Sequence, residues 1–551
     1  MRVATMKFAR FRLFGAILLF LTLVILLTTG VAHLLRQNPV EPLEGRVIPR
    51  EGEDKIEIVN AAFLEGWKGK QVIPTPEVDL FTIIRRLSLA LTGAPPSLEE
   101  LRRLDTLEED ADPLQSWLDH LFADPRYHHY FAERLNRAFV GVEPGPFLVY
   151  RRRRLANWLA EELAANRPYD AMVRDLIASE GVWTTNPEAN FITATVIQNG
   201  DNKGPDEVKL AARTARAFLG ISLDCMQCHD DKFGDHWKQS HFHELAAFYA
   251  QAEMTLTGVR ESRNKDYKTA YLGQVDPEVV EPSVPFQKEL LPDTGNRRLR
   301  LAQWITHEEN RSFARAVVNR TWALLAGRPL HSPVDDIPLD GPFPAGMEEL
   351  TDFFIAENHN FQALIRMIAA SEPFHRDSRS VDPDNPVTQA QEEAWAAFPI
   401  TPLRSEQVAG SVIQAASLQA LDQESHFFTR LRRYGETREF VKRYGDQGEN
   451  EFAEEAGTIP QRLLLMNGKL VAERTEPNPI TNSATRLANY SPSNEEALNA
   501  AFLATLTRLP NEREREHFLS QLSTFRKKGR ERAMADVFWA LINTTEFSWN
   551  R

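Results

Sequence analysis

Apolar side chains recur at every third or fourth position along most of the chain, which is the spacing of one helix face. Leu80, Ile83, Ile84 and Leu87 show the pattern, and strand-like alternation is scarce throughout. Helix start signals accompany it: Ser97 with Glu100 predicts a capping box, and Asp112 before Pro113 suits the N-cap and first helical positions. We therefore expect a mainly α fold.

An apolar run over residues 13–35, broken only by Thr, Gly and one His, follows four basic residues, namely Arg2, Lys7, Arg10 and Arg12. The run is long enough to span a bilayer, whereas a cleaved signal peptide has an apolar core of roughly 7–15 residues. We predict a cytoplasmic segment over 1–12 and a transmembrane signal anchor over 13–35, with a cleaved signal peptide as the alternative. Basic residues before the span place everything after Arg36 outside. The expected location is the bacterial inner membrane, crossed once, with an ectodomain in the periplasm or cell envelope.

The rest of the chain divides by composition. Residues 36–76 are rich in Pro, Gly and charge without strong periodicity, and they are typical of a tether. Helical periodicity then predicts one unit over 77–255 and a second over 296–551, joined over 256–295 by a Pro-rich stretch that we expect to be a linker or a long surface excursion. Two long loops dense in Pro and Asp are expected over 327–344 and 372–401. We thus predict a two-part helical ectodomain with long loops.

The only two cysteines lie in the run Cys225-Met226-Gln227-Cys228-His229, which is the attachment signature of c-type haem. Two thiols at this spacing add to the two vinyl groups of one haem, and the adjacent imidazole ligates the iron from the proximal side. We therefore predict one covalent haem c on Cys225 and Cys228, with His229 as proximal ligand. Such attachment occurs on the outer side of the inner membrane, in agreement with the predicted topology.

The sixth iron ligand stays open among His241, His243, His236 and Met254. Each candidate also has an ordinary structural interpretation. The histidines are typical of the solvent-exposed start of a helix, and Met254 is typical of a hydrophobic core. Phe233, Trp237, Phe242, Phe248 and Tyr249 are either a wall for the macrocycle or ordinary core residues.

Other interpretations of the cysteine pair are a zinc site completed by His236 and His241, a disulfide or redox pair, and buried structural thiols. Only seven residues separate Cys228 from His236, whereas the usual zinc finger has about twelve at that point.

The net charge and the sequence motifs bear on which classes of function the chain can have. The net charge of −13 argues against nucleic acid as a partner, because phosphate binding needs a basic face. The chain has no G-x-S-x-G, H-E-x-x-H or P-loop run. Asp335 and Asp336, in a loop beside His331, are the best acidic pair outside the cysteine segment, and such pairs usually cap helices or face water. Asn319, Arg320 and Trp322 suit a buried polar network in the second unit.

The chain resembles secreted planctomycete-type proteins that pair a cytochrome c-like domain of unknown function with a C-terminal companion domain of unknown function, and the resemblance runs from residue 81 to 551. In the first unit it rests on residues 85–96, 124–127, 167–170, 218–220 and 225–230, followed by Phe233, Trp237, Phe242 and 246–248. In the second it rests on 313–316, 318–322, 327–330, 334–336, 460–461, 465–467 and 540–547. Many relatives read C-x-x-C-H-D-H, but Asp231 replaces the second His here, so no metal role is carried over to it.

The resemblance implies an envelope or exported haem protein whose reaction is unassigned. We expect a membrane-anchored, monohaem, cytochrome-like protein that transfers electrons to a redox or envelope protein partner, docked by the second unit. One alternative is a non-haem structural or zinc-binding surface scaffold. Another is an envelope oxidoreductase or hydrolase acting on polysaccharide.

Overall fold

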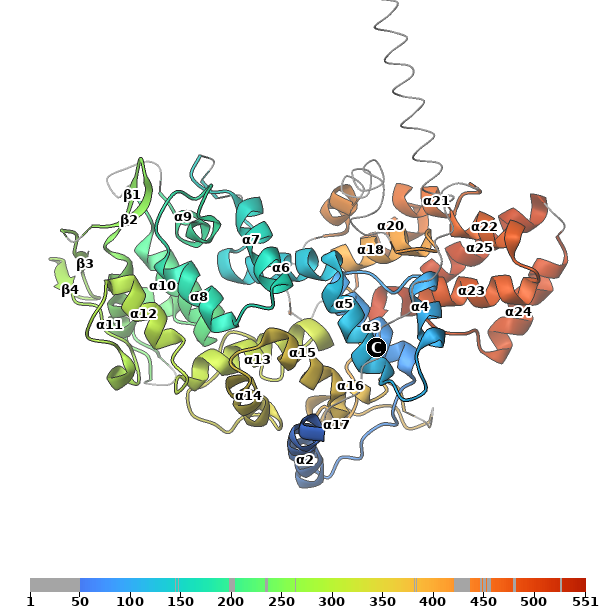
Figure 1. Cartoon of the computed structure of the whole chain (residues 1–551), viewed down its shortest axis with the longest axis horizontal. Coiled ribbons are helices and arrows are strands. Elements are labelled where there is room, and N and C mark those ends of the chain that lie inside the picture. The colour runs from blue at the N-terminus through green and yellow to red at the C-terminus, as the bar shows by residue number, and fades with distance from the viewer. Residues whose placement is uncertain are drawn as a thin grey trace, which may run out of the picture.

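The computed structural model describes residues 50–551 apart from 144, 147, 198–203, 233–235, 263, 381, 383, 421–436, 446–447, 449–451, 453–456, 479–481 and 526–527. The described part is mainly helical, as predicted, with a few short strands (Figure 1). None of the helices in that part is both long enough and apolar enough to cross a membrane. The segment 1–12 and the anchor predicted over 13–35 lie outside the described residues.

The helices fall into three groups along the chain. The first group is α2 (Arg50–Lys70), α3 (Leu80–Thr92), α4 (Leu98–Arg103), α5 (Pro113–Ala123), α6 (Pro125–Val140), α7 (Arg152–Ala164), α8 (Tyr169–Ala178), α9 (Asn190–Thr193), α10 (Glu207–Thr214) and α11 (Gln239–Ala246). The second is α12 (Arg297–Ile305), α13 (Arg311–Ala326), α14 (Met347–Ala356), α15 (Phe361–Ala370), α16 (Glu372–His375) and α17 (Gln389–Glu393). The third is α18 (Ser405–Ala415), α20 (Ile459–Asn467), α21 (Lys469–Thr475), α22 (Ser483–Tyr490), α23 (Asn494–Leu506), α24 (Glu512–Ser523) and α25 (Lys528–Ile542).

The described strands form three two-stranded antiparallel ribbons: β1 (Ala252–Thr255) with β2 (Gly258–Glu261), β3 (Tyr267–Thr269) with β4 (Glu278–Val280), and β5 (Thr401–Pro402) with β6 (Trp549–Asn550). In β1–β2, Met254 lies opposite Val259, and β5–β6 pairs Thr401 with Asn550. The helix start signals are also as predicted. Asp112 accepts hydrogen bonds from the backbone of Leu114 and Gln115, and Ser97 with Glu100 forms the capping box of α4.

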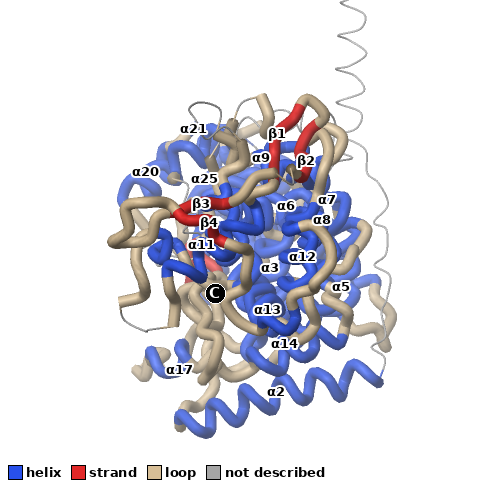
Figure 2. The backbone as a smooth tube through the Cα atoms, turned by 90° about the vertical axis from the view of Figure 1, so that its left-hand side faces the viewer, coloured by secondary structure: helices blue, strands red, loops and turns tan. Residues whose placement is uncertain are grey.

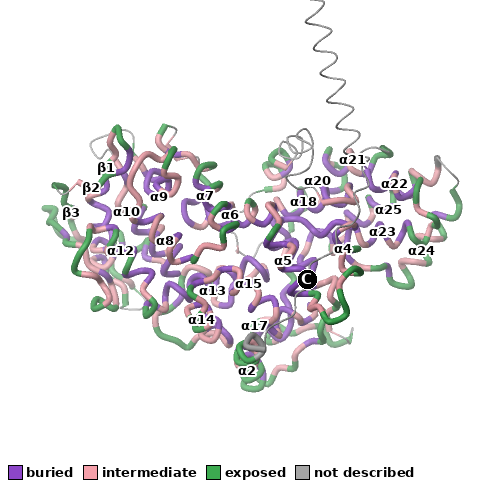
Figure 3. The backbone as a smooth tube through the Cα atoms, in the orientation of Figure 1, coloured by how far each residue is buried: buried purple, intermediate pink, exposed green. Residues whose placement is uncertain are grey.

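Two hydrophobic cores organise these helices, and buried residues run through both wings of the molecule (Figure 3). The larger core runs from Val59 to Phe398 and joins the first two groups. Within it, Tyr169 of α8 stacks on Phe313 of α13 and on Phe361 of α15, with ring centroids 5.7 and 5.6 Å apart. The smaller core lies among α18 and the helices that follow, with Leu89 and Leu98 added from the first group.

The cores do not follow the predicted division at 256–295. Helices α8 and α12 pack together across that stretch, and the division between the cores lies near residue 400. The predicted units 77–255 and 296–551 are therefore not separate cores, because the apolar faces of α12 to α15 are buried against the first group.

The segment predicted as a linker folds into β1 to β4. Val259 and Val284 are fully buried, and a backbone bridge joins Val259 to Gly181 with N–O distances of 2.9 and 2.8 Å. Gly258 permits this approach, since its φ is +100° and a Cβ there would lie 2.0 Å from the carbonyl oxygen of Gly181. The prediction of a linker is wrong because these short strands gain their stability from contacts distant in sequence.

The predicted tether over 36–76 is also wrong for its described part. Helix α2 lies along the base of the molecule (Figure 2), with Val59, Phe63 and Trp67 buried. Phe63 stacks on Trp322 with centroids 5.5 Å apart, and the indole of Trp67 donates to the carbonyl of Ala394 at 2.8 Å. The charged residues of this segment occupy the outer face of a packed helix.

Candidate functional site

The cysteine run lies on an exposed turn that is anchored from beneath. A helical segment with π geometry, Ala215–Leu219, ends at Gly220, whose φ is +65°, and the chain then enters a 3-10 turn at Asp224–Gln227. Leu223 and Met226 are buried and fix the turn to the larger core. The positions between them face outward.

Both cysteines, Cys225 and Cys228, are free thiols at the exposed surface of this turn. The backbone N–H of Cys228 donates to the carbonyl of Cys225 at 3.2 Å, so one turn presents both sulfurs. The adjacent His229 is half-buried, and its Nδ1 lies 2.8 Å from the carbonyl oxygen of Asp230. Because a carbonyl only accepts, Nδ1 carries the proton, and Nε2 of the neutral ring keeps its lone pair.

Helix α11 braces the turn through two side chains. Gln239 donates from its backbone to the carboxylate of Asp230 at 2.7 Å and from its side-chain amide to the carbonyl of Gln227 at 3.1 Å. His243 is buried, and its Nε2 donates to the same carbonyl at 3.2 Å, while Nδ1 accepts from the hydroxyl of Tyr267 at 2.8 Å. The conformation of the C-x-x-C turn is thus set by α11 and β3.

The proposed sixth ligands are in four different situations. Both ring nitrogens of His243 are engaged as described above. The Nδ1 of His241 accepts from the backbone of Lys238 at 3.3 Å, and burial lowers the pKa of this imidazole. His236 is exposed, and Met254 lies in β1, packed against the larger core. The β1–β2 ribbon and α11 lie at different heights in both views (Figures 1 and 2).

The aromatic residues of this segment are mostly core residues. Phe242, Phe248 and Tyr249 are at most 1% exposed, and the Tyr249 hydroxyl bonds to that of Thr214 at 2.6 Å. Trp237 is half-buried, and Phe233 lies outside the described residues. Of the described candidates, Trp237 alone lies partly at the surface.

A loop from the second helix group packs against the approach to the turn. The backbone N–H of Ile337 donates to the carbonyl of Gly220 at 2.7 Å, and Asp336 accepts a hydrogen bond from the backbone of Ser222. Burial raises the pKa of Asp336, and the nearby charges of Asp335 and Asp231 raise it further. The acidic pair is therefore a neighbour of the cysteine segment.

The predicted polar network in the second group is confirmed for Asn319. Its side chain is fully buried, donates to the carbonyls of His331 and Val334 at 2.8 and 3.2 Å, and accepts from the backbone of His331 at 2.9 Å. Asn319 therefore holds the loop that reaches the cysteine segment.

Another cluster of side chains that could bind a metal was not predicted from the sequence. Ligand atoms of Glu100, His120 and Asp124 lie within 4.8 Å of one another. The guanidinium of Arg126 lies between the two carboxylates and pairs with both. Burial would raise the pKa of Glu100, but Arg126 and His120 outweigh it and lower that pKa. The cluster is an ion-paired junction of α4, α5 and α6, which no local motif announces.

Two known protein families match the chain, one over the range that holds the cysteine run and one over the range that follows it. Residues 58–254, which include the cysteine run, match the family described as PSCyt2, a protein of unknown function (DUF1549). Residues 297–451 match the family described as PSD1, a protein of unknown function (DUF1553). The resemblance to a pair of domains of unknown function is thereby confirmed. Neither the curated proteins nor the solved structures contain a match to the chain.

Proposed function

We propose that the chain carries one haem c, attached through Cys225 and Cys228 with His229 as proximal iron ligand, and that it transfers electrons in the bacterial cell envelope. The observation that carries the proposal is the exposed turn itself. Two free thiols stand beside an imidazole whose Nδ1 proton is held by a backbone carbonyl. A metal-ligating histidine characteristically donates its other ring N–H in this way, which leaves Nε2 for the metal.

Attachment requires each thiol to add across one vinyl double bond, the sulfur bonding to one carbon and the proton going to the other. Bound haem iron supplies one-electron transfer. The chain itself supplies a fixed platform, because the bonds from Gln239 and His243 to the Gln227 carbonyl hold the turn. Leu272 offers apolar surface beside it: it is 76% exposed, and its backbone N–H donates to the side chain of Gln239 at 3.0 Å.

The exposure of the turn favours exchange of electrons with another protein, since a partner reaches the site without a conformational change. We propose that the partner is a redox or envelope protein with a basic docking surface, complementary to the net charge of −13. The segment 13–35 would anchor the chain in the inner membrane, and fractionation of cells into soluble and membrane fractions tests that part.

Zinc is the main alternative occupant of the cysteine pair. In the described part of the chain, three ligand atoms gather within 4.8 Å only at Glu100, His120 and Asp124. Among the described residues, the cysteines thus have no third ligand assembled beside them, whereas haem attachment needs only the pair and the following histidine. This difference favours haem.

The test is a haem stain of denatured protein produced with a cytochrome c maturation system. We expect covalent stain, at one haem per chain, in the wild type and in the control His236→Ala, and none in Cys225→Ser combined with Cys228→Ser. Since both cysteines are exposed, the double variant should keep the thermal transition of the unmodified chain. An unstained wild type that holds one equivalent of zinc would overturn the proposal.

A further inference from the structure

The β3–β4 loop, residues 270–277 between Thr269 and Glu278, exposes apolar side chains to solvent. Leu272 is 76% exposed and Val275 is 94% exposed, and Val279 in β4 is 47% exposed. Residues 272–279 are exposed without interruption. An apolar group placed against this loop would gain free energy, because contact removes apolar surface on both sides from water.

One side-chain amide joins the β3–β4 loop to the cysteine turn. The buried Gln239 of α11 accepts a hydrogen bond from the backbone N–H of Leu272 at 3.0 Å. The same amide group donates to the carbonyl of Gln227 at 3.1 Å. Because Gln227 directly precedes Cys228, a single amide bridges the backbone at Leu272 and the backbone of the C-x-x-C turn.

A second contact fixes the loop against α11. The ring of Tyr271 meets the ring of His243 edge-on, with centroids 5.7 Å apart and planes at 80°, and His243 bonds to the same Gln227 carbonyl at 3.2 Å. The loop is also closed on itself: the backbone N–H of Gln274 donates to the carbonyl of Tyr271 at 2.9 Å, and its side chain accepts from the N–H of Tyr271 at 3.3 Å. The position of the loop relative to the two thiols is therefore set by the folded chain itself.

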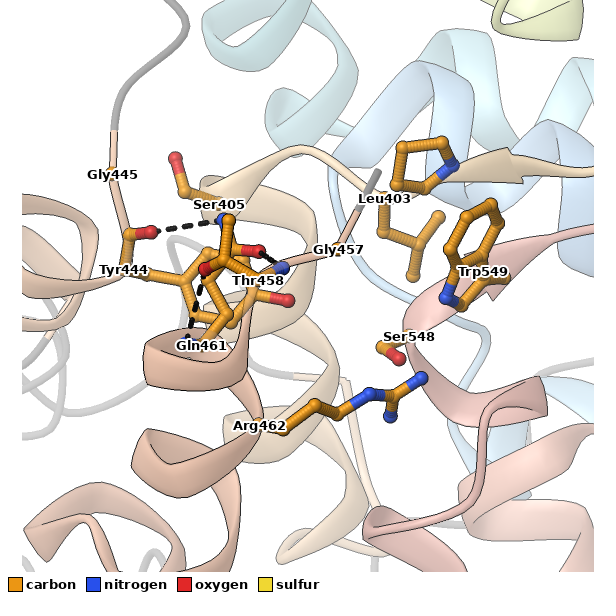
Figure 4. Close-up of a pocket in the computed structure, with 11 residues that line it drawn as sticks. Leu403, Ser405, Tyr444, Gly445, Gly457, Thr458, Gln461, Arg462, Ser548 and Trp549 are labelled. Carbon is orange, nitrogen blue, oxygen red and sulfur yellow. Dashed lines mark hydrogen bonds between the residues drawn. The ribbon is translucent and has the colours of Figure 1, made fainter. Parts of the chain in front are cut away.

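Two other surfaces do not suit a group attached to the turn. Phe242, Phe248 and Tyr249 are at most 1% exposed, so their rings are already packed in the core. A hollow lined by Tyr444 and Trp549 (Figure 4) lies at the starts of α18 and α20, and in Figure 1 these helices lie far from α11. The β3–β4 loop, in contrast, shares its supporting side chains with the turn.

We propose that the haem lies against the β3–β4 loop, with Leu272 and Val275 in contact with its macrocycle. This inference rests on the proposed attachment of haem to Cys225 and Cys228. Apolar side chains around a metal site restrict the access of water and lower the local dielectric constant. Such surroundings disfavour the extra positive charge of oxidised iron and so raise the reduction potential. Leu272 and Val275 are thus positioning residues that tune the potential.

Hydrogen exchange of the full chain in detergent, followed by mass spectrometry, tests the contact. The haem-loaded wild type is compared with Cys225→Ser combined with Cys228→Ser, which carries no attached haem. We expect peptides over 270–279 to exchange roughly threefold or more slowly in the loaded chain, because a covered loop opens less often. Peptides around Leu256, at the exposed tip of β1–β2, are the internal control and should exchange equally in both chains.

A redox titration followed by the absorbance of the haem gives a second measure. Leu272→Ser combined with Val275→Ser should shift the reduction equilibrium roughly tenfold toward the oxidised form, which is about 59 mV for one electron. Leu256→Ser is the matched control, since it makes the same change at an exposed leucine of the β1–β2 ribbon, which lies at a different height from α11 in both views (Figures 1 and 2). It should leave the potential unchanged. Thermal melts of the unloaded variants check that they fold.

The outcomes separate this inference from the proposed function. A wild type without covalent haem stain overturns the proposed function and this inference with it. Attached haem with equal exchange of 270–279 in the two chains, or with an unchanged potential in the variant of Leu272 and Val275, overturns the contact alone. Protection of the loop that disappears on dilution assigns the loop to a second copy of the chain, and protection that appears only when a redox protein is added assigns it to that partner; each of these results also overturns the contact.

Discussion

The Nε2 atom of His243 lies 3.2 Å from the carbonyl oxygen of Gln227, inside the C-x-x-C turn. Nε2 carries the proton of this ring, because its partner only accepts, and Nδ1 therefore accepts from Tyr267. A histidine that looks like an iron ligand in the sequence is thus a brace for the turn.

Replacing His243 with Phe should lower the free energy of unfolding by about 1–2 kcal/mol at pH 7.5, because the Gln227 carbonyl loses one of its two donors and the buried Tyr267 hydroxyl loses its acceptor. Burial lowers the pKa of His243, with the bond to Gln227 opposing the shift. The neutral ring therefore stabilises the fold fully above about pH 6.5, its unfolded pKa, and less as pH falls below it. Urea unfolding at pH 7.5 and 5.5 should show a smaller difference between wild type and variant at pH 5.5. An equal difference at both values would contradict this assignment, and His236→Gln serves as the exposed control.

Glu406 joins the two cores, since its carboxylate lies 3.2 Å from Arg134 and 3.8 Å from Arg137 of α6. Burial raises the pKa of Glu406, but the two guanidinium groups outweigh it and lower the pKa to about 2. The charged form stabilises the fold above about pH 4.5, and the gain is lost as pH falls toward 2. Glu406→Gln should cost about 1–3 kcal/mol at pH 7 and less at pH 3, measured by denaturant unfolding. The exposed Glu439→Gln should have little effect; a cost that is the same at both pH values would refute the ion pair's role.

The charge of Asp336 should affect folding stability in the opposite direction to that of Glu406. Its pKa is raised, first by burial and then by the charge of Asp335, so its charged form weakens the fold at neutral pH. Asp336→Asn keeps an acceptor for Ser222 and should raise stability at pH 7 by about 0.5 kcal/mol, after allowing for solvent screening. The gain should vanish below about pH 3.8, where the carboxyl is protonated in both states. Asp336→Ala, which loses the acceptor, should not be stabilising; a melting temperature lowered by both variants would refute the prediction.

Alanine substitutions at Gly258 and Gly273 distinguish the cost of a steric clash from the cost of backbone strain. Both glycines have a positive φ, +100° and +89°. A Cβ at Gly258 meets the backbone of Gly181, whereas one at Gly273 meets nothing within 4 Å. Gly258→Ala should therefore cost about 3 kcal/mol or more, and Gly273→Ala about 1 kcal/mol. Thermal unfolding of both variants measures the difference, and equal costs would mean that the bridge to Gly181 contributes nothing.

The features that local signals determine were predictable. The helical class, the Asp112 cap and the C-x-x-C-H motif all depend on residues within a few positions of one another. Helix α2 was predictable in principle, since Val59, Phe63 and Trp67 recur every four residues, but its charged outer face conceals the pattern. The folding of 256–295 was not, because Val259 pairs with Gly181 across many residues of sequence.

The candidate site divides in the same way. Cys225, Cys228 and His229 are adjacent and form a motif, whereas the side chains that hold the turn come from α11 and β3. Asp336 reaches the segment from a loop more than a hundred residues further on. Periodicity identifies helices but does not give their partners.

The stacking of Tyr169 between Phe313 and Phe361 has a practical consequence for anyone who dissects this chain. The ranges that match the two families, 58–254 and 297–451, share one hydrophobic core and are not independent folding units. A fragment that stops at residue 254 would expose Tyr169 to water. A fragment that begins at residue 297 would expose Phe313 and Phe361, because Tyr169 would no longer pack on them. Each piece made alone should precipitate or bind chaperones, and only the two made together in one cell should recover a soluble molecule.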